Sequence, residues 1–299
     1  MEMHPVQESE ISDQKSVVVQ SLQQKEKQLF AALRGFGRVI VAFSGGTDSA
    51  YLAWAANRVL GPGALAVTAD SASLPEPHKR DAEAFVQRFG ISHEYVQTHE
   101  FDNPNYARNS PDRCFHCKDE LFTRLEELGL SRGYQHVIYG VNVDELGDYR
   151  PGQGAAKQHR VAAPLADAGL TKAEIRELSR LADLPTWDRP ASACLSSRIP
   201  YGTPVTIENV KTVEACEQQI KALGFRQFRV RFHGEVVRIE IAPDEMEKAL
   251  TLEMAQRFTR IFKDLGFRYV ALDLEGYRQG SLNEVLDLDR SRTVNVATQ

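Results

Sequence analysis

The chain has 299 residues, of which 42% are hydrophobic and 26% charged, the composition of a globular protein with one large domain or two modest ones. Its formal net charge of −5 argues against a dedicated nucleic-acid binder. No apolar run reaches the roughly 18 residues that span a bilayer, and the polar N-terminus is unlike a secretory signal, so we expect a cytoplasmic protein with no membrane partner.

The first two-thirds of the chain carry the pattern of a parallel α/β sheet. Residues 1 to about 15 are expected to be disordered, and the helix that follows ends at Gly35 and Gly37. Short buried strands are predicted at 38–43, 64–68, 91–96 and 136–139, with helices between them. Strands that alternate with helices predict a parallel sheet covered on both faces.

The pattern changes after about residue 201. A helix is predicted at 207–223, strands at 225–232 and 235–241, a helix at about 243–265 and a last strand at 268–274. His233 and Gly234 indicate a hairpin turn between the first two strands. We therefore expect a polar segment and helix at 1–36, an α/β domain at 37–200 and a small α+β domain at 201–299.

A glycine-rich hexapeptide stands at the junction between the first strand and the next helix. It consists of Ser44, Gly45, Gly46, Thr47, Asp48 and Ser49. Glycines let the backbone approach a phosphate, and a helix N-terminus supplies N–H donors and partial positive charge. Because a carboxylate repels phosphate, Asp48 would need a bridging Mg²⁺. The alternative is a glycine-rich turn in which Asp48 caps the helix.

This hexapeptide resembles the PP-loop of the N-type ATP pyrophosphatases, and it lacks the ending of a Walker A loop. The segments 109–118, 140–152 and 190–202 and the strand with Arg229 and Arg231 extend the resemblance. Together they are similar to the LarE family of ATP-dependent sulfur transferases, from about residue 38 to 277. The resemblance implies a parallel-sheet, HUP-like PP-loop domain followed by a small α+β domain.

The family resemblance also implies a reaction and roles for particular residues. ATP would be cleaved to AMP and pyrophosphate while a pyridinium biscarboxylic acid mononucleotide is adenylylated, and sulfur would then be transferred to make a nickel-pincer cofactor. The PP-loop, Gly140 and Lys118 would contact ATP, with Asp48 and Lys118 in the chemistry. Glu145, beside Asp144, would bind Mg²⁺, unless these acids simply form a solvated loop.

Four polar residues are implied in binding the acceptor's phosphate, namely Ser197, Arg198, Arg229 and Arg231. Because side chains alternate across a strand, Arg229 and Arg231 share one face and could hold a single anion. The alternative is that both arginines are exposed on the surface of a sheet. His233, in the turn beside them, is expected to be solvated.

The cysteines are Cys114, Cys117, Cys194 and Cys216. The first three suit a [4Fe–4S] cluster with one open iron, as proposed for three-cysteine members of the family. Three alternatives stay open: Cys194 as a sacrificial sulfur donor that becomes dehydroalanine, a zinc site with His116 or an acid, and a redox pair. His116 is expected to point away from a helical CxxC site, and Cys216 to be a small buried bystander.

Other functions compete with this interpretation. A tRNA thiolase should carry a basic, aromatic RNA-binding extension, which the small α+β block and acidic balance disfavour. An amide-forming synthetase would not need three cysteines, and an iron–sulfur carrier or nucleotide sensor would not release pyrophosphate. We expect a homo-oligomer whose partners are a small nucleotide substrate and a sulfur donor, without nucleic acid.

Overall fold

The computed structural model describes residues 5–147, 150–190, 193–278 and 281, with side chains from residue 20 onward. The described chain forms two compact units, and two connections of the first unit's sheet belong to the second. The first unit holds the chain up to Asp70, Pro77–Thr98 and residues 118–190. The second holds Ser71–Glu76, His99–Cys117 and the chain from residue 193. The units are therefore not linear segments, and the linear domain boundaries stay a prediction.

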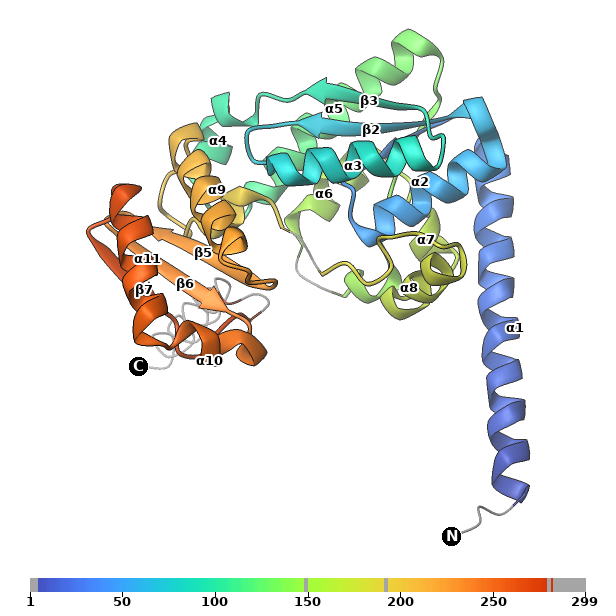
Figure 1. The fold of residues 1–299 in the computed structure, drawn as a ribbon. Coiled ribbons are helices and arrows are strands. Elements are labelled where there is room, and N and C mark those ends of the chain that lie inside the picture. The colour runs from blue at the N-terminus through green and yellow to red at the C-terminus, as the bar shows by residue number, and fades with distance from the viewer. Residues whose placement is uncertain (1–4, 148–149, 191–192, 279–280, 282–299) are drawn as a thin grey trace, which may run out of the picture. The chain divides into compact units, whose positions relative to one another are not determined.

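The first unit is built on a four-stranded parallel sheet (Figure 1). Its strands, in the order β3-β2-β1-β4, are β1 Val39–Ala42, β2 Ala64–Asp70, β3 His93–Gln97 and β4 His136–Tyr139. Val39 pairs with Ala64 on one side and with His136 on the other. The sheet matches the predicted strands closely, and β1 and β4 meet where the order of the strands reverses, the usual place for a ligand in such sheets.

Helices cover both faces of this sheet. They are α1 Pro5–Phe36, α2 Thr47–Leu60, α3 Glu76–Arg88, α5 Arg113–Arg132, α6 Pro151–Gln158, α7 Pro164–Asp167 and α8 Lys172–Leu181, with short η1 Gly61–Gly63 and η3 Val143–Glu145. Buried residues of α1, α2, α3 and α8 join Val39 and Val41 in one core. On the opposite face α5 approaches Ile40, since a Cβ at Gly129 would lie 3.6 Å from its Cδ1.

The first helix begins earlier than the sequence suggests. α1 starts at Pro5, whereas residues 1 to about 15 were expected to be disordered; residues 1–4 lie outside the described part of the chain. Proline suits the first turn of a helix, where its missing N–H has no partner to lose. Farther along, Leu22, Leu29 and Leu33 bury one side of α1 in the first unit's core.

The second unit contains a three-stranded sheet in the order β5-β6-β7. Its elements are η2 Glu100–Asp102, α4 Pro104–Ala107, the first turn of α5, η4 Leu195–Arg198, α9 Ile207–Ala222, β5 Phe228–His233, β6 Val236–Ile241, η5 Pro243–Glu245, α10 Met246–Ala249, α11 Leu252–Asp264 and β7 Tyr269–Leu272. β5 and β6 form the predicted hairpin, and β7 runs parallel to β6. The predicted fold class is confirmed, a parallel α/β PP-loop domain followed by a small α+β domain.

One predicted helix is interrupted. The structure breaks 243–265 into η5, α10 and α11, because Thr251 starts a new helix and its side chain accepts from the backbone N of Met254 at 3.2 Å. Such a cap satisfies a donor that a helix end leaves unpaired. α9 and α11 pack their apolar sides on β5 and β6 around Phe258 and Phe262.

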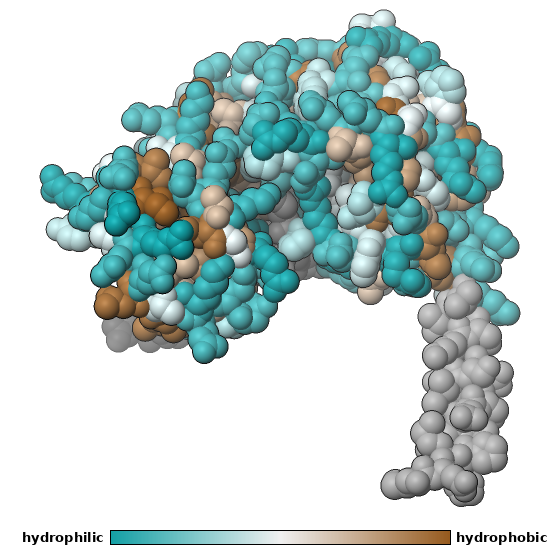
Figure 2. Space-filling view, in the orientation of Figure 1, coloured by the Kyte–Doolittle hydropathy of each residue, from teal (hydrophilic) through white to brown (hydrophobic). Residues whose placement is uncertain are grey.

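None of the described helices is both long and apolar enough to cross a bilayer. The face in Figure 2 is mostly hydrophilic and carries only small hydrophobic patches. Single exposed apolar residues are normal on a protein surface.

Candidate functional site

The PP-loop turns sharply from β1 into α2. Gly45 has a φ of 72°, in the left-handed region that glycine adopts without strain. Ser44 and Ser49 close the loop, with their hydroxyl oxygens 3.0 Å apart, and the Ser49 hydroxyl donates to the carbonyl of Gly46 at 3.1 Å. Gly46 precedes the helix without a side-chain cap. The N–H groups of the first turn of α2 can therefore serve a phosphate.

Gly140 lies at the end of β4, beside the PP-loop. A Cβ at this position would be 2.7 Å from the backbone N of Ser49 and 2.9 Å from the carbonyl carbon of Asp48. Only glycine allows β4 to approach the first turn of α2 so closely. The structure thus gives Gly140 a packing role, and its contact with ATP stays a prediction.

Asp48 is part of a buried network with two oxygen atoms that lack a donor. Its Oδ2 accepts from Nζ of Lys172 at 2.7 Å and from Nδ2 of Asn142 at 3.4 Å. Its Oδ1 and the Oδ1 of Asn142 are buried and, within the described residues, have no hydrogen-bond partner. Carboxylate and amide oxygens are ligands that Mg²⁺ accepts, and buried acceptors rarely stay unsatisfied. These two residues therefore fit the ion that the sequence predicts at Asp48.

The two acids after β4 differ in their contacts. Asp144 accepts from the backbone N of Lys172 at 2.8 Å, which places the side chain of Lys172 toward Asp48. Glu145 is partly buried and accepts from Nη1 of Arg150 at 2.8 Å. Burial raises the pKa of Glu145, and the charge of Asp48 adds to the rise while Arg150 opposes it. Glu145 is thus close enough to Asp48 to feel its charge, and its binding of Mg²⁺ stays a prediction.

Lys118 lies on α5, one residue beyond Cys117. Its Nζ is 5.9 Å from the ring centroid of Phe122, a weak cation–π contact. The side chain is half-buried. Its contact with the nucleotide phosphates stays a prediction.

Two of the three predicted cluster cysteines lie near one buried tyrosine of the second unit. Cys114 is exposed, whereas Cys117 and Cys194 are half-buried, and Cys117 packs into the apolar cluster of Tyr106 and Leu195. Burial raises the pKa of Tyr106, and the charges of Cys194 and Cys117 raise it further. Cys117 and Cys194, which are far apart in sequence, are therefore both close enough to the phenol of Tyr106 to affect its pKa.

The cysteines supply the donor set of a [4Fe–4S] cluster, but not its arrangement. Cys114 and Cys117 are three residues apart on the first turn of α5, where helical side chains are neighbours. Within the described residues, no three His, Cys, Asp or Glu side chains are grouped so as to hold a metal ion. A cluster on the three thiolates would thus require their side chains to turn toward one another.

The structure also shows the surroundings of His116 and Cys216. His116 has its Nε2 3.4 Å from Oδ2 of Asp112, so its ring is directed at that acid. Cys216 is fully buried in the core of α9 and the sheet, and burial raises the pKa of its thiol to about 12. The expectation that Cys216 is a small buried residue is confirmed.

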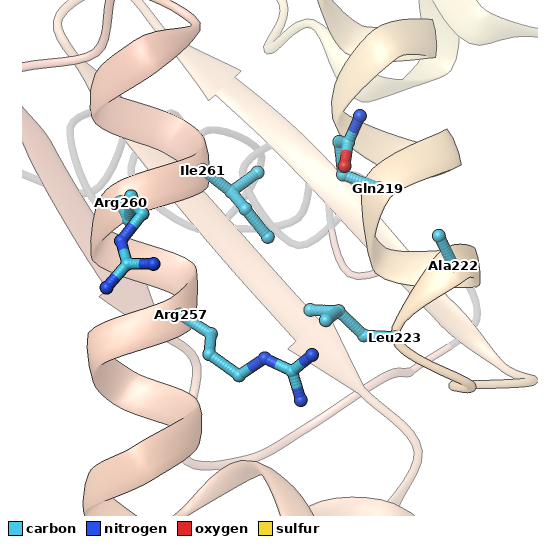
Figure 3. A pocket seen from close by; sticks show the side chains of 6 residues that line it. All are labelled: Gln219, Ala222, Leu223, Arg257, Arg260 and Ile261. Atoms are coloured by element: carbon cyan, nitrogen blue, oxygen red, sulfur yellow. The ribbon is translucent and has the colours of Figure 1, made fainter.

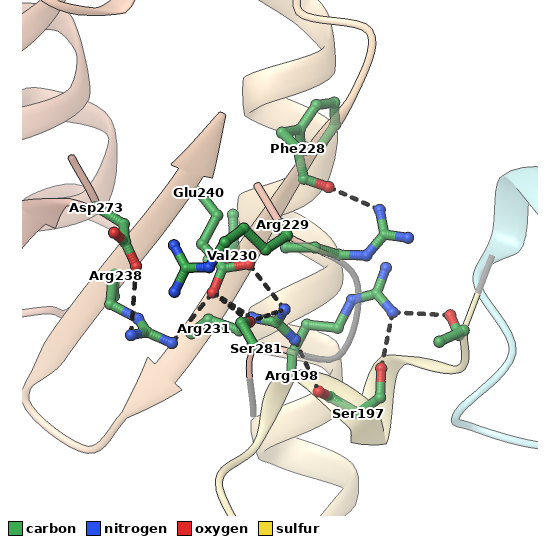
Figure 4. Close-up of polar contacts among 12 residues, drawn as sticks. Ser197, Arg198, Phe228, Arg229, Val230, Arg231, Arg238, Glu240, Asp273 and Ser281 are labelled. Atoms are coloured by element: carbon green, nitrogen blue, oxygen red, sulfur yellow. Dashed lines mark hydrogen bonds and ion pairs between the residues drawn. The ribbon is translucent and has the colours of Figure 1, made fainter. Parts of the chain in front are cut away.

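The predicted phosphate-binding arginines form a network with carboxylates (Figure 4). Arg198 binds both carboxylate oxygens of Glu217, at 2.9 and 3.0 Å. Arg231 binds both oxygens of Glu240, at 2.9 and 2.7 Å, and a further donor reaches the carbonyl of Ser197 at 3.0 Å. Arg231 is 5% exposed and Glu240 is fully buried. Arg231 could therefore bind a phosphate only by breaking hydrogen bonds that it already makes to Glu240 or Ser197.

Arg229 has different surroundings. It is half-buried, its Nη1 donates to the carbonyl of Phe228 at 2.7 Å, and its guanidinium lies 5.0 Å from the ring centroid of Tyr277. Burial lowers the pKa of Arg229, and the charge of Arg198 lowers it further. An added anion would relieve this repulsion.

Guanidiniums and carboxylates alternate in this network. Arg198 pairs with Glu217, Arg231 and Arg238 both bind Glu240, and Arg238 also approaches Asp273. The charge of Arg198 reaches Arg229 and lowers its pKa. Guanidiniums gathered in this way suit a phosphate, whose contacts with Ser197, Arg198, Arg229 and Arg231 stay predictions.

Cys194 is hydrogen-bonded directly to this arginine network. Its carbonyl accepts from the hydroxyl of Ser197 at 2.7 Å and from Nη1 of Arg198 at 3.0 Å. Nη1 of Arg198 also donates to the carbonyl of Ala193 at 2.8 Å. The predicted sulfur residue and the predicted phosphate site therefore adjoin within one unit.

A shallow groove of the second unit contains none of the predicted site residues. It lies between α9 and α11, has a volume of about 310 Å³ and is lined by Gln219, Ala222, Leu223, Arg257, Arg260 and Ile261 (Figure 3). The groove is on the helical side of the sheet. Arg238 and Glu240 alternate along β6 with buried Val237 and Ile239, so they face the other side.

Four residues that complete the two sites are not predicted from the sequence. Lys172 and Asn142 complete the Asp48 network, and Glu217 and Glu240 complete the arginine network. The capping box formed by Thr171 and Glu174 is a sequence signal that could have located the helix start at Lys172. Nothing in the sequence places that helix start beside the PP-loop, because this depends on the sheet.

Comparison with known proteins points to one family. The NAD synthase family profile matches residues 17–119, which include the PP-loop. The chain is 34% identical over 267 residues to pyridinium-3,5-bisthiocarboxylic acid mononucleotide synthase of Lactiplantibacillus plantarum, covering 89% of this chain and 96% of that protein. It is 45% identical over 260 residues to an uncharacterized protein of Synechocystis sp., covering 87% of this chain and 96% of that protein.

A more distant relative extends the range of organisms. It is an uncharacterized protein of Methanocaldococcus jannaschii, 26% identical over 241 residues that cover 81% of this chain and 91% of that protein. The near-complete coverage shows that the two units occur together in these relatives. With a PP-loop on a parallel sheet, a small α+β unit and this identity to the L. plantarum synthase, the chain belongs to the LarE family of PP-loop proteins.

Proposed function

We propose that this protein is an ATP-dependent sulfur transferase that adenylylates a pyridinium carboxylate mononucleotide and then replaces the adenylate with sulfur. The observation that carries the proposal is the hydrogen bonding of Cys194 to Ser197 and Arg198, next to the guanidiniums of Arg229 and Arg231. This arrangement suits a sulfur donor beside an anchored phosphate. The name of the L. plantarum relative supplies the class of acceptor.

The proposed reaction has two steps. An acceptor carboxylate oxygen attacks the α-phosphorus of ATP, the bond between the α- and β-phosphates breaks, and pyrophosphate leaves. A sulfide-level sulfur then attacks the acyl carbon, the carbon–oxygen bond to AMP breaks, and a thiocarboxylate remains. No oxidant or reductant is consumed when the sulfur enters as sulfide.

The residues of the first unit are proposed to serve the first step. Ser44 to Ser49 would bind the phosphates through hydroxyls and helix N–H groups, with Lys118 adding a positive charge. Asp48 and Asn142 would hold Mg²⁺, which when bound screens the phosphate charge. Lys172 keeps the Asp48 carboxylate oriented, and Glu145 is the proposed additional acid.

The residues of the second unit are proposed to serve the second step. Cys114, Cys117 and Cys194 would hold a [4Fe–4S] cluster, which when bound supplies an open iron for an extra sulfide. Arg229 would bind the acceptor's phosphate, with Ser197, Arg198 and Arg231 around it. A cytoplasmic location, a homo-oligomeric assembly and a separate sulfur donor belong to the same proposal.

The experiment is an assay of purified, anaerobically prepared protein with ATP, Mg²⁺, sulfide and the pyridinium biscarboxylate mononucleotide. We expect AMP and pyrophosphate in equal amounts, dependent on the acceptor, and a thiocarboxylate product. ADP and orthophosphate would overturn the adenylylation step. Iron and acid-labile sulfide analysis tests the cluster, while a mass loss of one H₂S at Cys194 would show sacrificial donation instead.

A further inference from the structure

The loop that follows Cys194 is fastened to the segment that precedes α5 of the second unit. Asn109 is fully buried and has a φ of 59°, a conformation that asparagine tolerates better than most residues. Its Nδ2 donates to the carbonyls of Ile199, Pro200 and Thr203 at 3.2, 2.8 and 2.8 Å. Its own carbonyl accepts from the backbone N of Gly202 at 3.1 Å. One side chain thus fixes the path of residues 199–203.

Arg113 joins the two segments that carry the cysteines. It is 5% exposed, and its Nη1 donates to the carbonyl of Ser196 at 2.8 Å and to Oδ1 of Asn109. Ser196 is in turn held by the hydroxyl of Tyr106 at 2.7 Å. Arg113 directly precedes Cys114, and Ser196 stands two residues after Cys194. The bond between Arg113 and Ser196 therefore sets where Cys194 lies relative to the start of α5.

The charge of Arg113 is not neutralised by a carboxylate in the part of the chain that the structure describes. Its hydrogen-bond acceptors are an amide and a carbonyl oxygen, whereas buried Arg198 and Arg231 each bind a carboxylate. Burial opposes the charge, but Cys194 and Cys114 raise the pKa of Arg113 above its ordinary value. The bond from Arg113 to the carbonyl of Ser196 is therefore charge-assisted, and such bonds are stronger than those between neutral groups.

We propose that Arg113 is the positioning residue of the sulfur site, which holds Cys194 beside Cys114 and Cys117 by tying Ser196 to the start of α5. The proposal rests on the proposed function for the role of these cysteines, but the position it assigns to Cys194 does not depend on catalysis. Lysine should replace Arg113 only in part, because its shorter side chain places the ammonium nitrogen short of the position from which Nη1 reaches both Ser196 and Asn109.

The test is cross-linking of the full-length protein, free of metal, with a short bifunctional thiol reagent, followed by peptide mapping. Wild type should give cross-links from Cys194 to Cys114 or Cys117. In Arg113→Gln the initial rate of cross-linking should fall roughly tenfold or more, the factor expected for one charge-assisted hydrogen bond. Arg113→Lys should lie between wild type and Arg113→Gln. The matched control is Arg108→Gln, an exposed arginine 3.8 Å from Asp112, which should behave as wild type.

The outcomes separate this inference from the proposed function. Equal cross-linking in wild type and Arg113→Gln, or no cross-link in wild type, would overturn it. If Arg113→Gln does not fold, Arg113→Lys decides, because a folded Lys variant that cross-links at the wild-type rate would show that Nη1 is not needed to hold Cys194. If a folded Gln variant and the Lys variant lost cross-linking rate equally, the role of Arg113 would be packing alone. ATP cleavage by wild type tests the proposed function independently, since cross-linking needs no ATP.

Discussion

The two polar sites of this protein are built in opposite ways. In the first unit, Asp48 and Asn142 each bury an oxygen that has no donor within the described residues. In the second unit, the carboxylates of Glu217 and Glu240 are both occupied by guanidiniums. The first site therefore offers acceptor oxygens to a cation. The second gathers guanidiniums that repel one another, which suits an anion.

This difference changes what a mutation should do. At the first site the proposed partner is Mg²⁺ from outside the chain, so a substitution should mainly affect ligand binding and chemistry. At the second site the partners are residues of the chain, and losing one leaves a buried charge with fewer partners. A substitution at the first site should therefore change catalysis but not stability, whereas a substitution at the second site should change both.

The largest effect is expected at Asp48. Asp48→Asn should lower the rate of pyrophosphate release by at least about 10³-fold, the scale on which an electrostatic group aimed at the reacting atoms acts. The melting temperature should change little, because the Asn side chain keeps the shape of Asp48. The control is Asp183→Asn, an exposed acid with a φ of 54° that asparagine accepts. Normal pyrophosphate release by Asp48→Asn would remove Asp48 from the site.

A large effect on stability is expected in the arginine network. Arg231→Met should reduce the free energy of unfolding by about 1.5–3 kcal/mol, because the fully buried Glu240 loses both bonds from Arg231 and keeps only those from Arg238 and Ser281. The double variant with Glu240→Gln should recover part of this loss, and urea unfolding measures both. Arg226→Met is the matched control, since Arg226 is exposed and 3.6 Å from Asp244. A double variant as unstable as the sum of the two single variants would show that the pair is not coupled.

Arg229 sharpens the comparison, because it should separate binding from stability. Arg229→Met should weaken acceptor binding by roughly 10- to 150-fold, the loss of one charge-assisted contact. ATP binding should be unaffected, and stability should fall less than in Arg231→Met, since Arg229 binds a carbonyl and an aromatic ring. Calorimetric titration with the acceptor measures this. Unchanged acceptor affinity would assign the phosphate to another part of the network.

The sequence predicts the strands, helices and loops of these sites better than the side chains that pair within them. Strand and helix periods place the PP-loop between β1 and α2, and the hairpin places Arg229 and Arg231 on β5. Lys172 reaches Asp48 from 124 positions away because α8 packs beside α2, which no local pattern encodes. Likewise the pairing of Arg231 with Glu240 follows from the β5–β6 hairpin and from burial. The break in the helix predicted at 243–265 depends on one capping residue, Thr251.

The smallest expected effect concerns a histidine held between two acids in the first unit. His159 has Nδ1 3.0 Å from Glu126 and Nε2 2.9 Å from Asp119, which ties the end of α6 to α5. Burial lowers the pKa of His159, but the hydrogen bonds to both carboxylates outweigh it and raise the pKa above 6.5. Because the folded value exceeds the unfolded one, the stabilisation is fully present below the unfolded pKa and is lost as pH rises through the folded pKa.

His159→Gln should therefore destabilise the protein at about pH 5.5, by up to about 1 kcal/mol, and much less at about pH 9, where the imidazole is neutral. Thermal unfolding of wild type and variant across this range measures the difference. His99→Gln serves as the control, because His99 is mostly exposed and its Nδ1 lies 3.9 Å from Asp102. A loss of stability at about pH 9 as large as that at about pH 5.5 would mean that packing, not charge, holds His159 between the acids.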